Sequence, residues 1–387
     1  MSLIPVKAEG FAYGGEAFGR LPDGRICFFR GGVPGETAEL ELGCVKRSFA
    51  RGMLRRISEP SPSRVVPVCP LAARPGGERF CPGCSFQQVD YSVELFWKQR
   101  QLTDFLVRAK LAEASTLDDP VPSPSRFGWR NRIKLSRIDG VAGFFAEDNE
   151  SIVPVEHCPL AVAALDAAIP ACRDLPGDGE IFLRWTEADG VTVNSGDREL
   201  TETLEEFGEF SVAADSFFQT NSQVAAQLLR GAAGMLKEIG ARRLLELYCG
   251  VGVFSLAAVQ MVPELRSFGV ELDARAIGCA RRNARSRDVA DRCRFAVGNA
   301  EKWRNIPDGF TPDAVLVDPP RRGLSEKLIS SLRRWRVPHV IYVSCAPDTL
   351  TRDLKALSDA YRVAKCRLYD MFPCTAHFET LTLLDLK

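Results

Sequence analysis

One cysteine, Cys345, ends a short apolar run in the sequence IYVSCAPDTL (341–350) and is followed closely by a proline. A buried cysteine usually behaves as a small, inert hydrophobic residue. A cysteine at a ligand-binding edge can instead act as a thiolate nucleophile. The local sequence allows both interpretations, so the choice between them depends on which other residues would lie near Cys345.

From about residue 211 onward, apolar strands alternate with helical segments. The expected strands are 244–248, 267–272, 292–298, 313–318 and 339–345. This alternation predicts an α/β fold with a parallel sheet covered on both faces, that is, a doubly wound Rossmann-like domain. Ligands bind such sheets beyond the carboxyl ends of the strands. Cys345 ends the fifth strand and is therefore expected at this edge.

A glycine turn after the first of these strands indicates a nucleoside cofactor. Gly250 and Gly252 would allow a tight turn, and Glu271 ends the next strand, 21 residues after Gly250. At that distance a carboxylate can accept both ribose hydroxyls. Ser255 stands where a dinucleotide fingerprint has its third glycine. Because S-adenosylmethionine carries no pyrophosphate, the pattern fits S-adenosylmethionine better than NAD or FAD.

Two further segments are expected to place reactive carboxylates at the same edge of the sheet. Asp318 begins an Asp-Pro-Pro corner after the fourth strand, and the two prolines would hold its carboxylate rigidly. Near the C-terminus, Glu379 follows His377 by two residues, so both would share one face of a strand. A cysteine with a separate base suits methylation at C5 of uracil: the thiolate adds to C6, C5 becomes nucleophilic, and a base later removes the C5 proton.

Five sequence motifs together closely resemble those of the RNA uracil-5-methyltransferases: DSFFQTN, LELYCGVGVFSL, DPPRRGL, YVSCAPDTLTRDL and MFPCTAHFET. The resemblance implies that Cys345 is the nucleophile and Glu379 the base that removes the proton. Phe217 or Phe218 is a candidate to stack on the target base. With Gly250 of the glycine turn, the implied contacts to S-adenosylmethionine are Gln219, Tyr248, Glu271, Asn299 and Asp318.

The N-terminal residues 1–58 contain short strands separated by Gly- and Pro-rich turns, which predicts a small β-barrel. Their segments GEAFGRLPDGR and GVPGE resemble the TRAM barrel that family members often carry. Apolar periodicity over 92–110 predicts a helix. The expected organisation is an RNA-binding TRAM-like barrel (1–58), a central α/β domain with an iron–sulfur site that also binds RNA (59–91 and 120–210), and a methyltransferase domain (92–119 and 211–387).

Thirteen cysteines in a sequence without a recognisable signal peptide favour metal binding or catalysis over disulfides, and a cytoplasmic location is expected. Four of them have the spacing C-x11-C-x2-C with a distant fourth: Cys69, Cys81, Cys84 and Cys158. Spacing alone leaves zinc and an iron–sulfur cluster equally open. The family resemblance implies a [4Fe-4S] cluster, with zinc as the alternative.

The formal net charge is zero, but residues 126–138 carry five basic residues and no acid, with Phe127 and Trp129 among them. Such a stretch can bind RNA, although a solvated strand face explains it almost as well. No segment approaches the roughly 20 apolar residues of a membrane span, and no protein partner is predicted.

The barrel and the cysteine set favour 23S ribosomal RNA over transfer RNA as the substrate. Methylation of cytosine C5 is a rival interpretation, but its usual Pro-Cys dipeptide is absent because Ser344 precedes Cys345. A second rival is an RNA-binding module that keeps a methyltransferase core without activity. Replacing Cys345 distinguishes the enzyme from this module.

Overall fold

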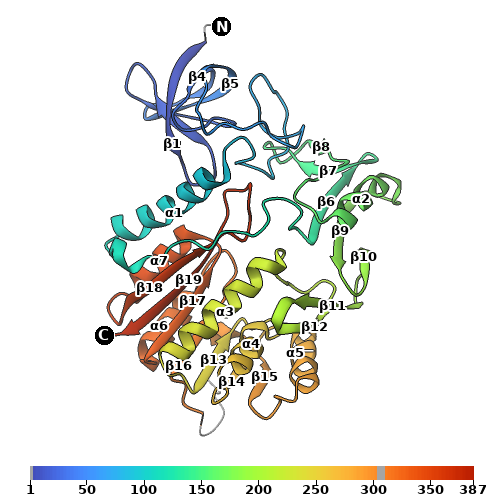
Figure 1. Cartoon of the computed structure of the whole chain (residues 1–387), viewed down its shortest axis with the longest axis vertical. Coiled ribbons are helices and arrows are strands. Elements are labelled where there is room, and N and C mark those ends of the chain that lie inside the picture. Colours follow the sequence, from blue (N-terminus) through green and yellow to red (C-terminus); the bar gives the residue numbers. More distant parts are fainter. Residues whose placement is uncertain (1–2, 303–309) are drawn as a thin grey trace. The chain divides into compact units, whose positions relative to one another are not determined.

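The computed structural model describes residues 3–302 and 310–387 (Figure 1). The chain divides into two compact units. The first unit comprises residues 1–101, 125–183 and 372–377, and the second comprises 102–124, 184–371 and 378–387. Each unit therefore combines stretches that are far apart in the sequence. Among the described residues, no helix has the length and apolar character needed to cross a membrane.

The N-terminal strands close into a barrel in the order β1-β2-β3-β5-β4, which confirms the predicted barrel. The strands are β1 (Ile4–Phe11), β2 (Ala17–Arg20), β3 (Ile26–Phe29), β4 (Thr37–Val45) and β5 (Phe49–Glu59). Alternate residues such as Val6, Ala8 and Leu40 point into its core. Gly19 is required where two strands approach, because a Cβ there would lie 2.1 Å from the carbonyl oxygen of Lys7.

A helix and a small sheet follow the barrel. The helix α1 (Tyr91–Arg108) confirms the periodicity predicted over 92–110, and the Asp90 carboxylate accepts the Ser92 N–H at its start, at 2.8 Å. The five-stranded sheet has the order β10-β9-β6-β7-β8. Its strands are β6 (Arg132–Ile138), β7 (Val141–Phe145), β8 (Ile152–Pro154), β9 (Gly179–Thr186) and β10 (Gly190–Val193), and the helix α2 (Ala163–Ala168) lies between β8 and β9 in the chain.

The second unit contains the hairpin β11 (Glu199–Leu204) and β12 (Gly208–Ala213) and a seven-stranded sheet in the order β15-β14-β13-β16-β17-β19-β18. The first five strands of that order are parallel, and β19 is antiparallel to both of its neighbours. The strands of the sheet are β13 (Arg243–Leu247), β14 (Arg266–Glu271), β15 (Cys293–Val297), β16 (Ala314–Val317), β17 (His339–Ser344), β18 (Tyr361–Tyr369) and β19 (Glu379–Leu386). The predicted doubly wound parallel sheet is thereby confirmed.

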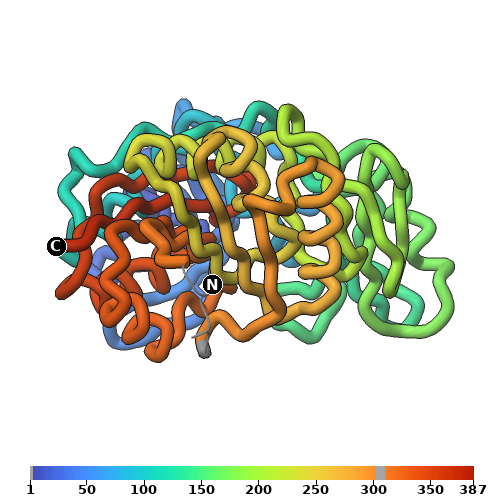
Figure 2. The backbone as a smooth tube through the Cα atoms, turned by 90° about the horizontal axis from the view of Figure 1, so that it is seen from below, coloured from blue at the N-terminus to red at the C-terminus, as the bar shows by residue number. Residues whose placement is uncertain are grey.

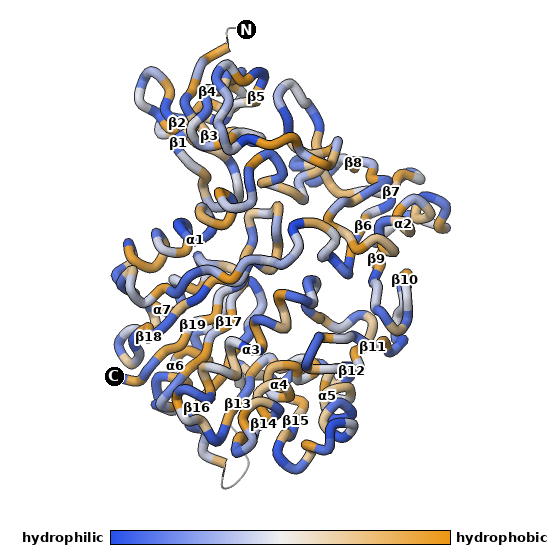
Figure 3. Tube along the Cα trace, viewed as in Figure 1, coloured by the Kyte–Doolittle hydropathy of each residue, from blue (hydrophilic) through white to orange (hydrophobic). Residues whose placement is uncertain are grey.

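Helices alternate with these strands, and their course is traced by colour in Figure 2. They are α3 (Ser222–Glu238), α4 (Val253–Met261), α5 (Ala274–Ser286), α6 (Glu326–Trp335) and α7 (Pro347–Leu357). The helix α4 is apolar along most of its length and largely buried, whereas α5 is amphipathic (orange and blue in Figure 3). This pattern reflects central burial of α4 and a solvent-facing side of α5.

Candidate active site

The strand register brings Cys345 and Glu379 together. Ser344, the last residue of β17, pairs with Thr380 of the antiparallel β19, and the Thr380 hydroxyl donates to the Ser344 carbonyl at 3.1 Å. Extending this register by one residue puts Cys345 opposite Glu379, on the same face of the sheet. Asp318 directly follows β16, the parallel neighbour of β17. The three groups therefore lie at one edge, where the parallel strands end.

Burial dominates the electrostatics of this group. The pKa of Cys345 is raised to about 12, chiefly by burial and also by the charges of Glu379 and Asp318, while Arg321 acts to lower it. Burial also raises the pKa of Asp318 to about 7. The pKa of Glu379 is raised well above its ordinary value, first by burial and then by Asp318, while Arg321 lowers it. Without ligands, the site thus favours a neutral thiol, with Arg321 as the opposing cation.

The predicted cofactor residues at the first two strand ends form a fixed turn. The Glu271 carboxylate accepts the backbone N–H groups of Gly250 at 3.2 Å, Leu272 at 2.6 Å and Asp273 at 3.1 Å. Tyr248 has a φ of 64°, a left-handed conformation that is uncommon for a residue with a side chain. Its buried hydroxyl has no hydrogen-bond partner among the described residues. Conformational strain and an unsatisfied polar group are both typical of binding sites.

The remaining cofactor candidates are also positioned by local structure. Gln219 is buried in the segment before α3. The Asn299 side chain accepts the backbone N–H two residues later, at 2.9 Å, after β15. Phe218 is buried and lies 6.1 Å from the ring of Phe210, whereas Phe217 is 67% exposed. Of the two predicted stacking residues, Phe217 is therefore the one whose side chain is accessible to a base.

Glu246 is a functional candidate that sequence reasoning treated only as part of a motif. It is completely buried in β13, and its Oε2 accepts the Ser255 N–H at 2.9 Å. Its Oε1 has no hydrogen-bond partner among the described residues, and burial raises its pKa to about 8. The signal for it was present in the sequence, because an acidic residue inside the apolar strand LLELY needs a specific reason to be buried.

One expectation about the base is wrong. His377 does not share a strand face with Glu379, because β19 begins at Glu379 and His377 belongs to the preceding turn. The chain enters the sheet only at Glu379, where its backbone begins to pair with β18. The neighbour of Glu379 in this site is therefore Cys345, the residue placed opposite it by the register.

The four predicted metal ligands converge on one cavity in the first unit. Cys69, Cys81, Cys84 and Cys158 all line it, and none is in a disulfide. The Gln87 side chain donates to the Cys84 sulfur at 3.2 Å and accepts the Cys69 N–H at 3.0 Å. Within residues 3–302 and 310–387, however, no three His, Cys, Asp or Glu side chains are arranged to hold a metal ion. Four thiols around one cavity are the soft donors that zinc and iron–sulfur clusters prefer. Their side chains are not arranged as the ligands of a metal ion in this structure.

The basic stretch 126–138 separates into structural and accessible parts. Arg126 is mostly buried and pairs with Glu94, so the expectation that it contacts RNA is not supported. Arg132 and Lys134 of β6 instead lie over the ring of Phe182, at 6.0 and 5.4 Å from its centroid. Phe182 is 37% exposed, and Lys134 also pairs with an acidic side chain of β9. These two cations and the aromatic ring form the phenylalanine platform, which suits contact with a base and a phosphate.

Two family models match the chain. The model described as tRNA (uracil-5-)-methyltransferase matches residues 205–387, and the TRAM domain model matches residues 2–54. The second match coincides with the closed barrel, and the first covers most of the second unit. Together they include every predicted catalytic and cofactor residue but not the cysteine cavity.

Several curated relatives match over nearly the whole chain. An uncharacterized RNA methyltransferase of Thermosynechococcus vestitus is 30% identical and covers 99% of this chain and 98% of its own length. Another, from Halalkalibacterium halodurans, is 27% identical and covers 100% and 97%. Among solved structures, the Pyrococcus abyssi tRNA (uracil-54, C5)-methyltransferase in complex with S-adenosyl-L-homocysteine has a TM-score of 0.75 at 24% identity, covering 98% of this chain and 99% of its own. This last similarity shows a shared fold.

Proposed function

Since the chain belongs to the RNA uracil-5-methyltransferase family, we propose that it transfers a methyl group from S-adenosylmethionine to C5 of a uridine in RNA. The observation that carries this proposal is the register that places Cys345 opposite Glu379 where the parallel strands end. A nucleophile and a base on one face of the sheet are what substitution at C5 of uracil requires.

The roles of the two residues follow from the chemistry of the ring. The Cys345 sulfur adds to C6, and the electron pair of the C5–C6 double bond moves onto C5 and O4. S-adenosylmethionine, when bound, supplies an electrophilic methyl group to C5. Glu379 then takes the proton from C5, the double bond re-forms, and the Cys345 thiolate leaves. The burial that raises the pKa of Glu379 makes its carboxylate a stronger base for this step.

The cofactor is held by residues at the ends of the first strands. Glu271 would accept the ribose hydroxyls, because its carboxylate is already oriented by three backbone N–H groups, one from Gly250 of the glycine turn and two from Leu272 and Asp273. Gly250 permits close approach of the ligand to the backbone. The other proposed contacts are Gln219, Tyr248, Asn299 and Asp318. The unpaired hydroxyl of Tyr248 is the strongest of these candidates for a new hydrogen bond.

Two variants test the catalytic assignment. Cys345→Ala should abolish methyl transfer while RNA binding is retained, and unchanged transfer would reject this nucleophile. Glu379→Gln should trap a methylated covalent adduct between protein and RNA, because the C5 proton remains in place. Normal turnover by Glu379→Gln would remove that residue from its role. RNA containing 5-fluorouridine provides the matched substrate, since it has no C5 proton and should form the adduct with the unmodified protein.

The second part of the proposal concerns the cysteine cavity, which would hold a [4Fe-4S] cluster, with zinc as the alternative. The support is that four thiols, which are soft ligands for iron or zinc, line a single cavity. Ligation would require the thiolates, whereas in the protein without metal the pKa of Cys81 is raised to about 11 and that of Cys84 to about 12, chiefly by burial. Iron, sulfide and zinc are to be measured in anaerobically purified protein, and a colourless sample with stoichiometric zinc would overturn the cluster.

The RNA substrate is proposed to be 23S ribosomal RNA, modified in the cytoplasm, with transfer RNA as the alternative. The support is the combination of a TRAM barrel with the cysteine cavity. The phenylalanine platform would contact the RNA outside the catalytic edge. The test is methylation of ribosomal and transfer RNA isolated from a strain that lacks the gene, followed by mapping of the restored mark. Labelling confined to transfer RNA would reject the ribosomal substrate.

A further inference from the structure

The segment 372–377, here called the base-proximal loop, ends two residues before the proposed base, and both its ends are joined to the second unit. The loop itself belongs to the first unit. At its centre, Cys374 is completely buried and has a φ of 66°. A left-handed residue with a side chain persists only where its surroundings fix it. The contacts of Cys374 therefore identify what determines the course of the loop.

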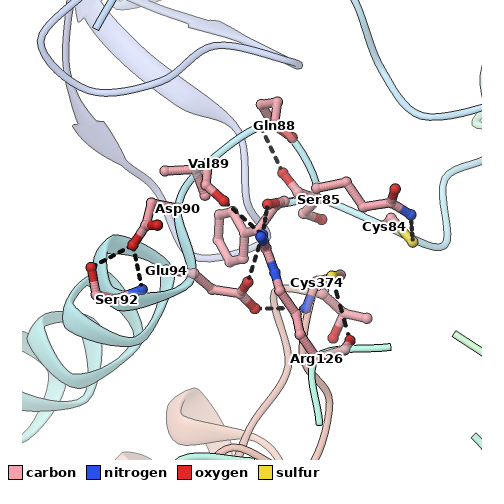
Figure 4. Close-up of polar contacts among 12 residues, drawn as sticks. Cys84, Ser85, Gln88, Val89, Asp90, Ser92, Glu94, Arg126 and Cys374 are labelled. Atoms are coloured by element: carbon pink, nitrogen blue, oxygen red, sulfur yellow. Dashed lines mark hydrogen bonds and ion pairs between the residues drawn. The ribbon is translucent and has the colours of Figure 1, made fainter. Parts of the chain in front are cut away.

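A buried ion pair on α1 holds the loop by its backbone. The Glu94 Oε1 accepts the Cys374 N–H at 2.7 Å and pairs with the Lys98 ammonium at 2.8 Å. The same ammonium donates to the Phe372 carbonyl at 3.1 Å. Both Glu94 and Lys98 side chains are completely buried. The pair thus binds two backbone groups of the base-proximal loop. Figure 4 shows the contact between Glu94 and Cys374.

The other backbone group of Cys374 is fixed by the turn that carries one of the cavity cysteines. The Cys374 carbonyl accepts the N–H groups of Ser85 at 2.8 Å and Phe86 at 3.0 Å, and these residues directly follow Cys84. Its sulfur lies 3.8 Å from the Arg126 carbonyl oxygen. All the hydrogen-bonding groups of Cys374 are therefore engaged, which explains how its backbone conformation is maintained.

Arg126 completes this network from the opposite side. One of its guanidinium nitrogens donates to the carbonyls of Phe86 at 2.8 Å and Val89 at 2.6 Å and lies 3.4 Å from Glu94. Figure 4 shows Arg126 between Glu94 and this stretch of backbone. The buried carboxylate consequently has two cationic partners. This arrangement, rather than RNA, accounts for the first cation of the basic stretch.

We propose that Glu94, together with Lys98, positions Glu379 for proton abstraction by fixing the backbone of the base-proximal loop. The inference rests on the proposed function of Glu379. Only Phe378 separates the loop from that residue, so the loop fixes the point at which the chain enters β19. Apolar residues often replace a buried ion pair without loss of stability. The stability of the fold therefore does not explain why Glu94 and Lys98 are charged. A catalytic base, in contrast, must be placed to within about 1 Å, and a fixed loop backbone would provide this.

The test compares two double variants that both remove the buried charges. Glu94→Met with Lys98→Met leaves the Cys374 N–H without an acceptor, whereas Glu94→Gln with Lys98→Met keeps a side-chain oxygen there. The first should accumulate the methylated protein–RNA adduct and lower kcat by up to about 100-fold, with KM for S-adenosylmethionine unchanged. The second should restore most of the turnover. Equal and normal turnover by both variants would overturn the proposal.

A buried ion pair in the barrel provides the matched control. Glu36 is completely buried, accepts the Val33 N–H at 2.9 Å and pairs with Arg64 at 2.7 Å. Glu36→Met with Arg64→Met should not raise the ratio of adduct to released product. An equal rise in this control would show that the adduct reflects general destabilisation and would overturn the proposal.

Two further measurements keep the outcomes distinct. If the Met–Met variant fails to fold in thermal melts, Glu94→Met alone is measured, since it removes the acceptor of the Cys374 N–H and leaves the contact of Lys98 to the Phe372 carbonyl. It should still accumulate adduct, and a normal adduct level would refute the inference. Glu379→Gln is assayed alongside. Absence of an adduct in that variant would contradict the proposed function itself, whereas an adduct there but not in the variants with Glu94→Met would contradict only the positioning role.

Discussion

Alkylation of Cys345 by iodoacetamide should respond to pH unlike that of an ordinary thiol. Burial and, to a smaller extent, the Glu379 charge raise the pKa of Cys345 to about 12, against the lowering effect of Arg321. Because the thiolate is the reactive form, the ligand-free protein should keep this sulfur largely unreactive at neutral pH. The perturbation is therefore a series of pH values from 7 to about 10.5 on the free protein.

The expected magnitude follows from two opposing effects. At pH 8, a thiol with a pKa of about 12 is roughly one part in 10,000 thiolate, whereas a thiol with a pKa of about 8.5 is roughly one quarter thiolate. A more basic thiolate is also more nucleophilic, and this difference in pKa increases the rate constant of the thiolate about 40-fold. The net expectation is that Cys345 reacts roughly 60-fold more slowly than an ordinary thiol at pH 8.

The assay is mass spectrometry of the individual cysteine peptides after timed alkylation, with the exposed Cys44 as the internal reference. Restricted access lowers the rate at every pH but does not move the midpoint. The rate at Cys345 should rise about tenfold per pH unit across the series. Arg321→Gln should lower the rate at every pH of the series, because loss of this cation raises the pKa of Cys345, whereas Arg322→Gln is the matched control without that effect. A plateau for Cys345 below pH 9 would refute the reasoning.

Three other predictions concern stability, RNA binding and the metal site. Burial raises the folded-state pKa of Glu246 to about 8, so stability should fall as pH rises from about 4.5 to 8, and Glu246→Gln should be more stable than the unmodified protein at pH 9 by up to about 4 kcal/mol in urea unfolding. Parallel pH curves for the two proteins would contradict this. Phe182→Ala should weaken binding of single-stranded RNA at least about fivefold by fluorescence anisotropy, and Lys134→Gln should reduce the salt dependence; unchanged binding in both would exclude the phenylalanine platform. Removing metal with a chelator should increase hydrogen exchange at the Ser85 amide, next to Cys84, and unchanged exchange would show that no metal braces this turn.

The sequence predicted the parallel sheet because its strands are almost continuously apolar and are followed by acidic or reactive side chains. Once the topology was inferred, Glu271, Asp318 and Cys345 necessarily shared one edge. The proximity of Glu379 to Cys345 required more. It depends on β19 lying between β17 and β18, and this insertion has no signature in local composition. The family resemblance, rather than the pattern of residues, was what paired these two side chains in advance.

The environment of charged residues was the weakest part of the sequence-based interpretation. Arg126 belongs to a run of cations, yet its partner Glu94 lies 32 residues earlier in the chain. The sequence shows which residues are basic, but it does not show which of them form an ion pair with a buried carboxylate in the folded protein. The base-proximal loop presents the same difficulty, because it belongs to a unit whose other residues are 1–101 and 125–183. Long-range packing determines both outcomes.

The unusual basicity of the site has opposite effects on two steps of the proposed reaction. A thiolate whose pKa is raised adds to C6 readily, but it is also a poorer leaving group at the end of the cycle. Its departure depends on removal of the C5 proton, so a strong and accurately placed base must compensate. The burial of Glu379 supplies the strength, and the ion pair of Glu94 and Lys98 supplies the placement through the base-proximal loop. Changes to Glu379 or to the Glu94–Lys98 pair should therefore slow the release of product from the covalent adduct rather than the formation of that adduct.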